Sequence, residues 1–201
     1  MERVQGHAGW KQRRCGKITA SRIYDIVNTK KNGDLTAAYS TYLNQLAEER
    51  VTGVPHSGFT TQAMADGTRK EPICRMLYSF AQDVDVEEIE FIDHPPIPNA
   101  GASPDGLIRE QKKFIEIKCP TLKVFEEIRA SKSVPGQHLC QIGWLFACQP
   151  EMEAADYVVY SDKAEPGQQL IIRTVKRNQQ FIDTLEQKVR DFDEAVERAA
   201  K

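Results

Sequence analysis

The sequence predicts an α/β domain in which helices lie in layers on both sides of a mixed central β-sheet. Two observations support this. Apolar residues recur at helical spacing in the amino-terminal part of the chain, and short segments of alternating apolar and polar residues follow them. Helical patterns and strand patterns then alternate toward the carboxyl end, which is typical of a three-layer fold. At 201 residues the chain has room for a substantial core, so we expect one domain over residues 1–201.

Helical patterns dominate the first part of the chain. The first helix should start at Thr19 and stop before Asn32-Gly33, a pair typical of turns. A second helix is expected over residues 36–51 and a third over residues 60–80, because apolar side chains recur on one face of each.

Strand patterns begin after the third helix. Residues 84–92 alternate, with a possible irregularity at Glu87-Glu88. The other expected strands are residues 102–109, 114–119, 157–160 and 170–175. Further helices are expected over residues 122–130, 136–148 and 178–201. The sheet is therefore expected to be flanked by helices on both faces.

The composition restricts the functional classes. Residues 1–31 hold eight Lys or Arg against two acids, whereas the whole chain has a net charge of -2, so the basic charge is concentrated at the amino-terminal end. A basic segment on an acidic protein can bind phosphates locally. The five cysteines are scattered without a C-x-x-C spacing, which argues against zinc and disulfide frameworks. No apolar run is long enough to span a bilayer, so we expect a cytoplasmic protein without a membrane partner.

The most informative stretch is the expected hairpin formed by residues 102–109 and 114–119. A loop centred on Glu110-Gln111 would set Asp105 opposite Glu116, and Lys118 would lie on the same face as Glu116. Two facing carboxylates repel each other unless a cation neutralises them, and their hard oxygen atoms suit Mg²⁺ or, alternatively, Mn²⁺. With Lys118 acting on a water molecule, this arrangement suits phosphodiester hydrolysis.

Each fragment of this pattern also has an ordinary interpretation. Pro-Asp-Gly is common in turns, and Glu-x-Lys is common on solvated strand faces. Their combination is more specific. Ser-Pro-Asp-Gly-Leu at residues 103–107 and Glu-Ile-Lys-Cys-Pro at residues 116–120 resemble the PD-D/E-x-K nuclease signature in the form found in the phage lambda exonuclease family, which includes the YqaJ-type viral recombinases. The resemblance implies a restriction-endonuclease-like core and adds the carbonyl of Ile117 as a metal ligand.

A second cluster lies near the amino terminus, in the motif Trp-x-x-x-Arg-x-Gly-x-x-Thr-Ala-Ser at residues 10–21. A basic side chain and a hydroxyl near a helix start can bind a phosphate. From the local pattern alone, Thr19 or Ser21 could equally serve as a helix cap. The motif is similar to one in the same exonuclease family, and this resemblance implies that Arg14 and Ser21 bind the 5′ phosphate of a DNA end.

Three more residues receive roles from the resemblance alone. Ser103 and Gln141 match family positions near the terminal phosphate. Glu71, in Gly-Thr-Arg-Lys-Glu-Pro, matches a helix-borne acid that approaches the metal, although the local pattern favours a surface position and Pro72 should disturb the helix. The expected catalytic set is therefore Lys118, Glu116, Asp105 and Glu71.

The resemblance implies a Mg²⁺-dependent 5′-to-3′ exonuclease that acts on double-stranded DNA ends carrying a 5′ phosphate, releases 5′ mononucleotides and leaves a 3′ single-stranded tail. It also implies a homotrimeric ring and a single-strand annealing recombinase as partner, in the cytoplasm of a bacterial host if the gene is of phage origin. Two alternatives remain open: a restriction-type or junction-resolving endonuclease on the same core, and a catalytically silent DNA-binding module.

Overall fold

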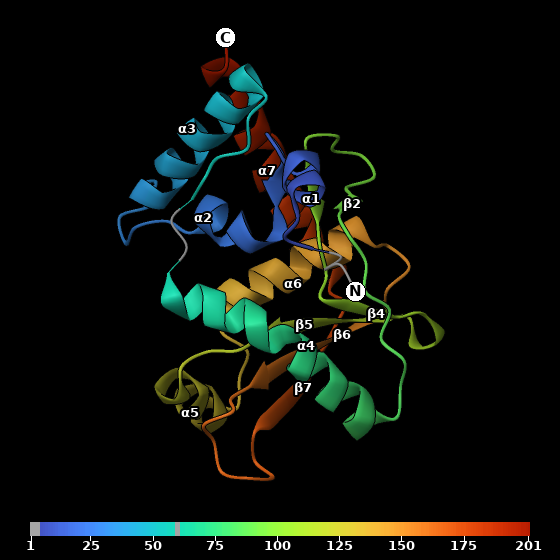
Figure 1. Ribbon diagram of the computed structural model, residues 1–201. Helices are drawn as coiled ribbons and strands as arrows, with labels where there is room; N and C mark the ends of the chain where they lie inside the picture. The colour runs from blue at the N-terminus through green and yellow to red at the C-terminus, as the bar shows by residue number, and fades with distance from the viewer. Residues whose placement is uncertain (1–4, 59–60) are drawn as a thin grey trace.

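The computed structural model describes residues 5–58 and 61–201 and has an α/β architecture (Figure 1). The helices are α1 (Ala8–Arg13), α2 (Ile23–Val27), α3 (Ala37–Thr52), α4 (Gln62–Gln82), α5 (Leu122–Ser131), α6 (Gly136–Cys148) and α7 (Gln179–Ala199), with short 3₁₀ turns η1 (Ala20–Arg22) and η2 (Arg109–Gln111). The strands are β1 (Ile18–Thr19), β2 (Ile92–Asp93), β3 (Ala100–Ala102), β4 (Gly106–Ile108), β5 (Lys113–Lys118), β6 (Ala154–Tyr160) and β7 (Leu170–Lys176).

The larger sheet has the strand order β4-β5-β6-β7 and is mixed, because β5 and β6 are parallel while the outer pairs are antiparallel. A second, smaller sheet has the strand order β1-β3-β2. The sequence predicts a single sheet. The division occurs at Ser103-Pro104-Asp105, where Pro104 has no N–H to donate to a ladder and the chain passes from one sheet to the other.

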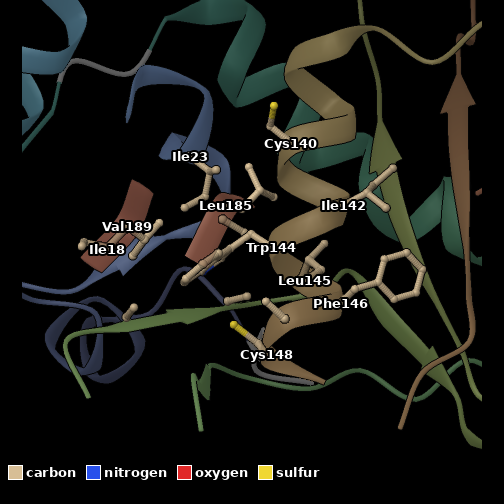
Figure 2. Packing of buried hydrophobic residues seen from close by; sticks show 14 of the residues in the cluster. Ile18, Ile23, Cys140, Ile142, Trp144, Leu145, Phe146, Cys148, Leu185 and Val189 are labelled. Carbon is tan, nitrogen blue, oxygen red and sulfur yellow. The ribbon is translucent and has the colours of Figure 1, made fainter. Parts of the chain in front are cut away.

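Helices cover both faces of the larger sheet, which confirms the layered α/β prediction. On one face α4 contacts β5, β6 and β7, as Figure 1 shows, and buries Cys74 and Tyr78 against Ile115 and Ile117. The main core lies on the other face, around α6. In Figure 2, Trp144 lies on the side of α6 near Ile18 and Val189, whereas Phe146 points away from them.

Strand β5 shows the predicted alternation. Phe114 belongs to the main core around α6, whereas Ile115 and Ile117 belong to the smaller cluster under α4. Successive side chains of a strand point to opposite faces, so Glu116 and Lys118 lie on the same face as Phe114, toward α6. Glu116 and Lys118 therefore lie beside the main core, near the carboxyl end of β5.

Several predicted helices agree closely with the structure. Thr36 caps α3 by accepting a hydrogen bond from the N–H of Tyr39, and Gly53 ends the helix in the left-handed conformation. Asn178 caps α7 in the same way as Thr36 caps α3. The expected start of the third helix, Thr60, lies outside the described residues. Pro72 lies within α4, and the chain remains helical on both sides of it.

Three predicted elements were wrong. The strand expected over residues 102–109 is broken, because β3 ends at Ala102 and β4 covers only Gly106–Ile108. The first helix ends at Val27, where Asn28 is extended and Thr29 pairs with Leu35 across the turn at Asn32-Gly33. Residues 84–92 do not form a continuous strand. Their backbone pairs with β4 only through one bridge, between Glu87 and Leu107. The alternation of apolar residues instead reflects side chains such as Val84 and Val86, which pack against the smaller core cluster.

No helix within the described residues is both long enough and apolar enough to cross a membrane.

Candidate active site

The hairpin of β4 and β5 has the predicted register. Gly106 pairs with Ile115 and Ile108 with Lys113, and the N–H of Asp105 donates to the carbonyl of Ile115 at 3.2 Å. Asp105 thus continues the ladder by one residue, toward Glu116. Its side chain turns along β5, where its Oδ2 accepts a hydrogen bond from the N–H of Ile117 at 2.6 Å.

Glu116 is the centre of a compact polar cluster. Its side chain is 1% exposed, and its Oε1 accepts hydrogen bonds from Lys118 Nζ and from Gln141 Nε2, both at 2.6 Å. Lys118 also donates to Gln141 Oε1 at 3.1 Å, which closes a triangle between β5 and α6. The second oxygen of Glu116, Oε2, is buried and has no hydrogen-bond partner among the residues that the structure describes. A buried acceptor without a partner is energetically unfavourable in a folded protein and calls for a ligand.

The electrostatics of this cluster favour an additional cation. Burial, with smaller repulsive contributions from Asp105 and Glu71, raises the pKa of Glu116 to about 8, although Lys118 opposes the shift. Burial also raises the pKa of Asp105, against the attraction of Lys118. Burial alone would lower the pKa of Lys118, but the carboxylates of Glu116 and Asp105 outweigh it and raise that pKa. One ammonium therefore does not fully compensate the carboxylates.

The donors fit a hard divalent cation. Asp105 and Glu116 offer carboxylate oxygen atoms, one of them unpartnered, and Ile117 offers a backbone carbonyl between Glu116 and Lys118. Within the described residues, no three His, Cys, Asp or Glu side chains converge as a complete metal cage. Mg²⁺ commonly binds through one or two carboxylates and completes its shell with water and phosphate oxygens, so a two-carboxylate site suits it.

Glu71 approaches this cluster from α4, on the opposite side of the sheet strand from α6. It is partly buried and close enough to raise the pKa of Glu116. One turn further along α4, Arg75 donates from Nε to the carbonyl of Asp105 at 2.9 Å and pairs with Glu88. Helix α4 thus both fixes the loop of Asp105 and brings a third acid toward the site.

Arg14 and Ser21 line a second feature, a pocket of about 490 Å³ between the amino-terminal segment and α3. The guanidinium of Arg14 lies 3.9 Å from the centroid of the Trp10 ring. Thr19, at the start of η1, makes no side-chain capping hydrogen bond, and Ser21 is exposed at the pocket. The capping interpretation of this motif therefore lacks the hydrogen bond it requires at Thr19.

Trp10 connects the pocket to the acidic cluster. Its indole Nε1 donates to Ser103 Oγ at 3.1 Å, and Ser103 lies two residues before Asp105. Of the four residues expected near a phosphate, Arg14 and Ser21 line the pocket, Ser103 is joined to it through Trp10, and Gln141 lies instead in the cluster of Glu116 and Lys118. Sequence reasoning included Trp10 only as part of a motif and did not predict this link.

Sequence reasoning also missed a pair of residues beside Lys118. His138 on α6 shares a hydrogen bond of 2.7 Å with the hydroxyl of Tyr157, which is the residue of β6 paired with Glu116. Burial, assisted by the positive charge of Lys118, lowers the pKa of His138 to about 4. Burial raises the pKa of Tyr157 to about 12. The position of Tyr157 on a predicted strand parallel to β5 was the only signal that could have indicated this contact.

Comparisons with known proteins identify exonucleases of similar fold. The alkaline exonuclease LHK-Exo from Laribacter hongkongensis, solved in complex with dAMP, is 30% identical, with a TM-score of 0.89 over 96% of this chain and 94% of that protein. A phage-related exonuclease from Haemophilus somnus 129PT is 12% identical, with a TM-score of 0.69 over 90% of this chain and 94% of that protein, and it supports the fold. No curated protein is similar enough to count as a match.

Both likenesses confirm the predicted restriction-endonuclease-like fold, and the likeness to LHK-Exo supports a nuclease. The model of the YqaJ-like viral recombinase domain matches residues 9–151, a span that contains the Arg14 motif, the Asp105 loop and both β5 and α6. Because this match covers most of its length, the chain belongs to the YqaJ-like viral recombinase family.

Proposed function

We propose that this chain is a Mg²⁺-dependent 5′-to-3′ exonuclease that degrades one strand of duplex DNA from an end carrying a 5′ phosphate, with Mn²⁺ as an alternative ion. It would release 5′ mononucleotides and leave a 3′ single-stranded tail. The observation that carries the proposal is the unpartnered oxygen of Glu116, buried beside Asp105 and Lys118. Family membership and the likeness to LHK-Exo, whose bound dAMP is a nucleoside monophosphate, support the same reaction class.

In this proposal Asp105, Glu116 and the carbonyl of Ile117 hold the ion, with Glu71 near it. When bound, the ion would stabilise negative charge on the attacked phosphate and on the departing 3′ oxygen. Lys118 stays charged, because its pKa is raised, and it is held in place by Glu116 and Gln141. A fixed ammonium of this kind can orient a water molecule for attack on the phosphate.

Recognition of the strand end is assigned to the pocket of Arg14 and Ser21, together with Ser103, which Trp10 joins to it, and Gln141, which lies in the cluster of Glu116 and Lys118. An arginine is well suited to a terminal phosphate because its planar group donates two parallel hydrogen bonds. The link from Trp10 to Ser103 supports a fixed spacing between the bound end and the site of cleavage. A fixed spacing of this kind would explain removal of one nucleotide per step.

Three further features of the proposal rest on the family resemblance. The single domain over residues 1–201 would assemble as a homotrimeric ring around DNA, and a single-strand annealing recombinase would receive the 3′ tail. We expect the protein to act in the cytoplasm of a bacterial host. Sedimentation of the purified protein as a stable monomer would contradict the ring.

One set of substrates tests the reaction. Linear duplex with a 5′ phosphate, the same duplex with a 5′ hydroxyl, and a closed circle are each incubated with and without Mg²⁺. We expect Mg²⁺-dependent mononucleotide release, fastest from the phosphorylated linear duplex and absent from the circle. Cutting of the circle would instead favour a restriction-type or junction-resolving endonuclease, and duplex binding without any metal-dependent product would favour a silent DNA-binding module.

A further inference from the structure

The loop that carries Arg14 is held by two consecutive side chains of α3. The N–H of Gly16 donates to Glu49 Oε2 at 2.7 Å, and the carbonyl of Gly16 accepts from Arg50 Nε at 2.9 Å. Arg50 is itself fixed by Asp193 of α7 at 2.5 Å. Both backbone groups of Gly16 are therefore bonded to side chains rather than to other backbone groups.

These two hydrogen bonds require glycine at position 16. Its φ of +71° lies in the left-handed region, and an added Cβ would lie 2.9 Å from Cγ of Arg50. The loop can approach α3 this closely only with glycine at this position. Arg14, two residues earlier, caps α1 through its own N–H, and the bonds of Gly16 set this end of α1 relative to α3.

Glu49 also holds the opposite rim of the pocket. Its Oε1 accepts from the N–H of His56 at 3.1 Å and from Gln45 Nε2 at 3.0 Å. The loop of His56, Ser57 and Gly58 lines the same pocket as Arg14 and Ser21. One carboxylate, 7% exposed, thus joins both walls of the pocket, and its charge also acts on Arg14.

We infer that Glu49 and Arg50 are positioning residues, which set Arg14 and the loop of residues 56–58 at the separation that a terminal phosphate needs. This inference rests on the proposed function of the pocket. Glu49 accepts three hydrogen bonds and its carboxylate has no hydrogen of its own, so replacing it with the isosteric Gln turns one oxygen into a donor that faces another donor. The shape of the side chain is kept, while its hydrogen bonds to the two loops are weakened and the negative charge that acts on Arg14 is lost.

The test compares Glu49→Gln with Glu48→Gln, an exposed neighbour on the same helix. The measurements are KM and kcat on linear duplex with a 5′ phosphate and with a 5′ hydroxyl. We expect Glu49→Gln to lower the preference for the phosphorylated end roughly tenfold through KM, which is what loss of one charge-assisted hydrogen bond produces. The rate on the 5′ hydroxyl duplex should stay within about twofold, because transition-state contacts are untouched. Glu48→Gln should match the parent.

The outcomes separate the inference from the proposed function. A parent protein without any preference for the 5′ phosphate would overturn the proposed end recognition. A parent with the preference, and a Glu49→Gln variant that retains it fully or slows equally on both substrates, would overturn the positioning role alone. If Glu49→Gln does not fold, as judged by circular dichroism, Arg50→Lys decides the matter, because it removes the donor to Gly16 and should lower the same preference.

Discussion

The ammonium of Lys118 lies 2.6 Å from one carboxylate oxygen of Glu116, and the other oxygen of Glu116 is buried without a hydrogen-bond partner in the described part of the chain. The lysine is thus fixed in position, yet the carboxylate keeps a free acceptor for a ligand. A structural ion pair in a protein interior is stable only when its remaining lone pairs are also satisfied. Buried unpartnered atoms also occur elsewhere in the described residues, for example at Arg50, so it is the combination of the incomplete pairing with the neighbouring carboxylate of Asp105 that favours a cation site here.

Replacing Lys118 with Ala should abolish most of the nuclease activity. The variant loses the charged group that orients water, so the rate of mononucleotide release should fall at least about 100-fold, the lower range for a group of this kind. Lys123→Ala, an exposed lysine on α5, serves as the control and should leave the rate unchanged. Digestion of linear duplex by Lys118→Ala at the parent rate would contradict the assignment.

Mg²⁺ should stabilise the folded protein in the absence of DNA. An ion that binds only the folded state adds about 2.7 kcal/mol when its concentration is 100 times the dissociation constant. Thermal unfolding should therefore shift upward with Mg²⁺ in the parent and in Glu110→Gln, whose side chain is exposed in η2, but not in Glu116→Gln. An equal shift in Glu116→Gln would place the ion elsewhere.

The hairpin of the site was predictable because its determinants are local. Alternation along β5 and the length of the connection fix which residues of β4 and β5 face each other, and the observed pairing of Gly106 with Ile115 is the predicted one. The helices α3, α6 and α7 were predictable for the same reason, since their apolar residues, and for α3 and α7 also their caps, lie within single segments.

Contacts between distant segments were beyond the reach of sequence reasoning. Trp10 meets Ser103 across 93 positions, and His138 meets Tyr157 across two different elements, so no local pattern encodes either contact. The prediction of a strand over residues 84–92 was wrong for a related reason. The residues do alternate, but only tertiary packing decides whether such a segment pairs along its whole length or, as here, only at Glu87 and at Ile92, where β2 begins.

His138 should make stability depend on acid pH. Its pKa is lowered from 6.5 to about 4 in the folded protein, chiefly by burial. Below pH 6.5, His138 is protonated in the unfolded chain but stays neutral in the folded protein. The free energy of unfolding should therefore fall as the pH drops from 6.5 to about 4. His138→Gln, which can still bond to Tyr157, should lack this component, at most about 3 kcal/mol.

The measurement for His138 is urea unfolding at pH 7 and at pH 4, compared as the difference between parent and variant so that other titrating groups cancel. His56→Gln, an exposed histidine, is the control and should follow the parent. If the parent and His138→Gln lose the same stability between the two pH values, His138 is not the group responsible.

Gly101 should tolerate no side chain, because β3 lies close to the chain of β2. An added Cβ would lie 2.4 Å from the carbonyl oxygen of Ile92 and 2.3 Å from Cζ of Phe91, which is buried. Backbone on one side and core on the other leave little room to relax, so Gly101→Ala should lower the free energy of unfolding by about 1–3 kcal/mol. Gly136→Ala is the matched control, since no heavy atom lies within 4 Å of its added Cβ and it opens helix α6. Denaturant unfolding should show a lower midpoint for Gly101→Ala and an unchanged or higher one for Gly136→Ala, whereas equal midpoints would mean that β2 and β3 are not packed as closely as the geometry requires.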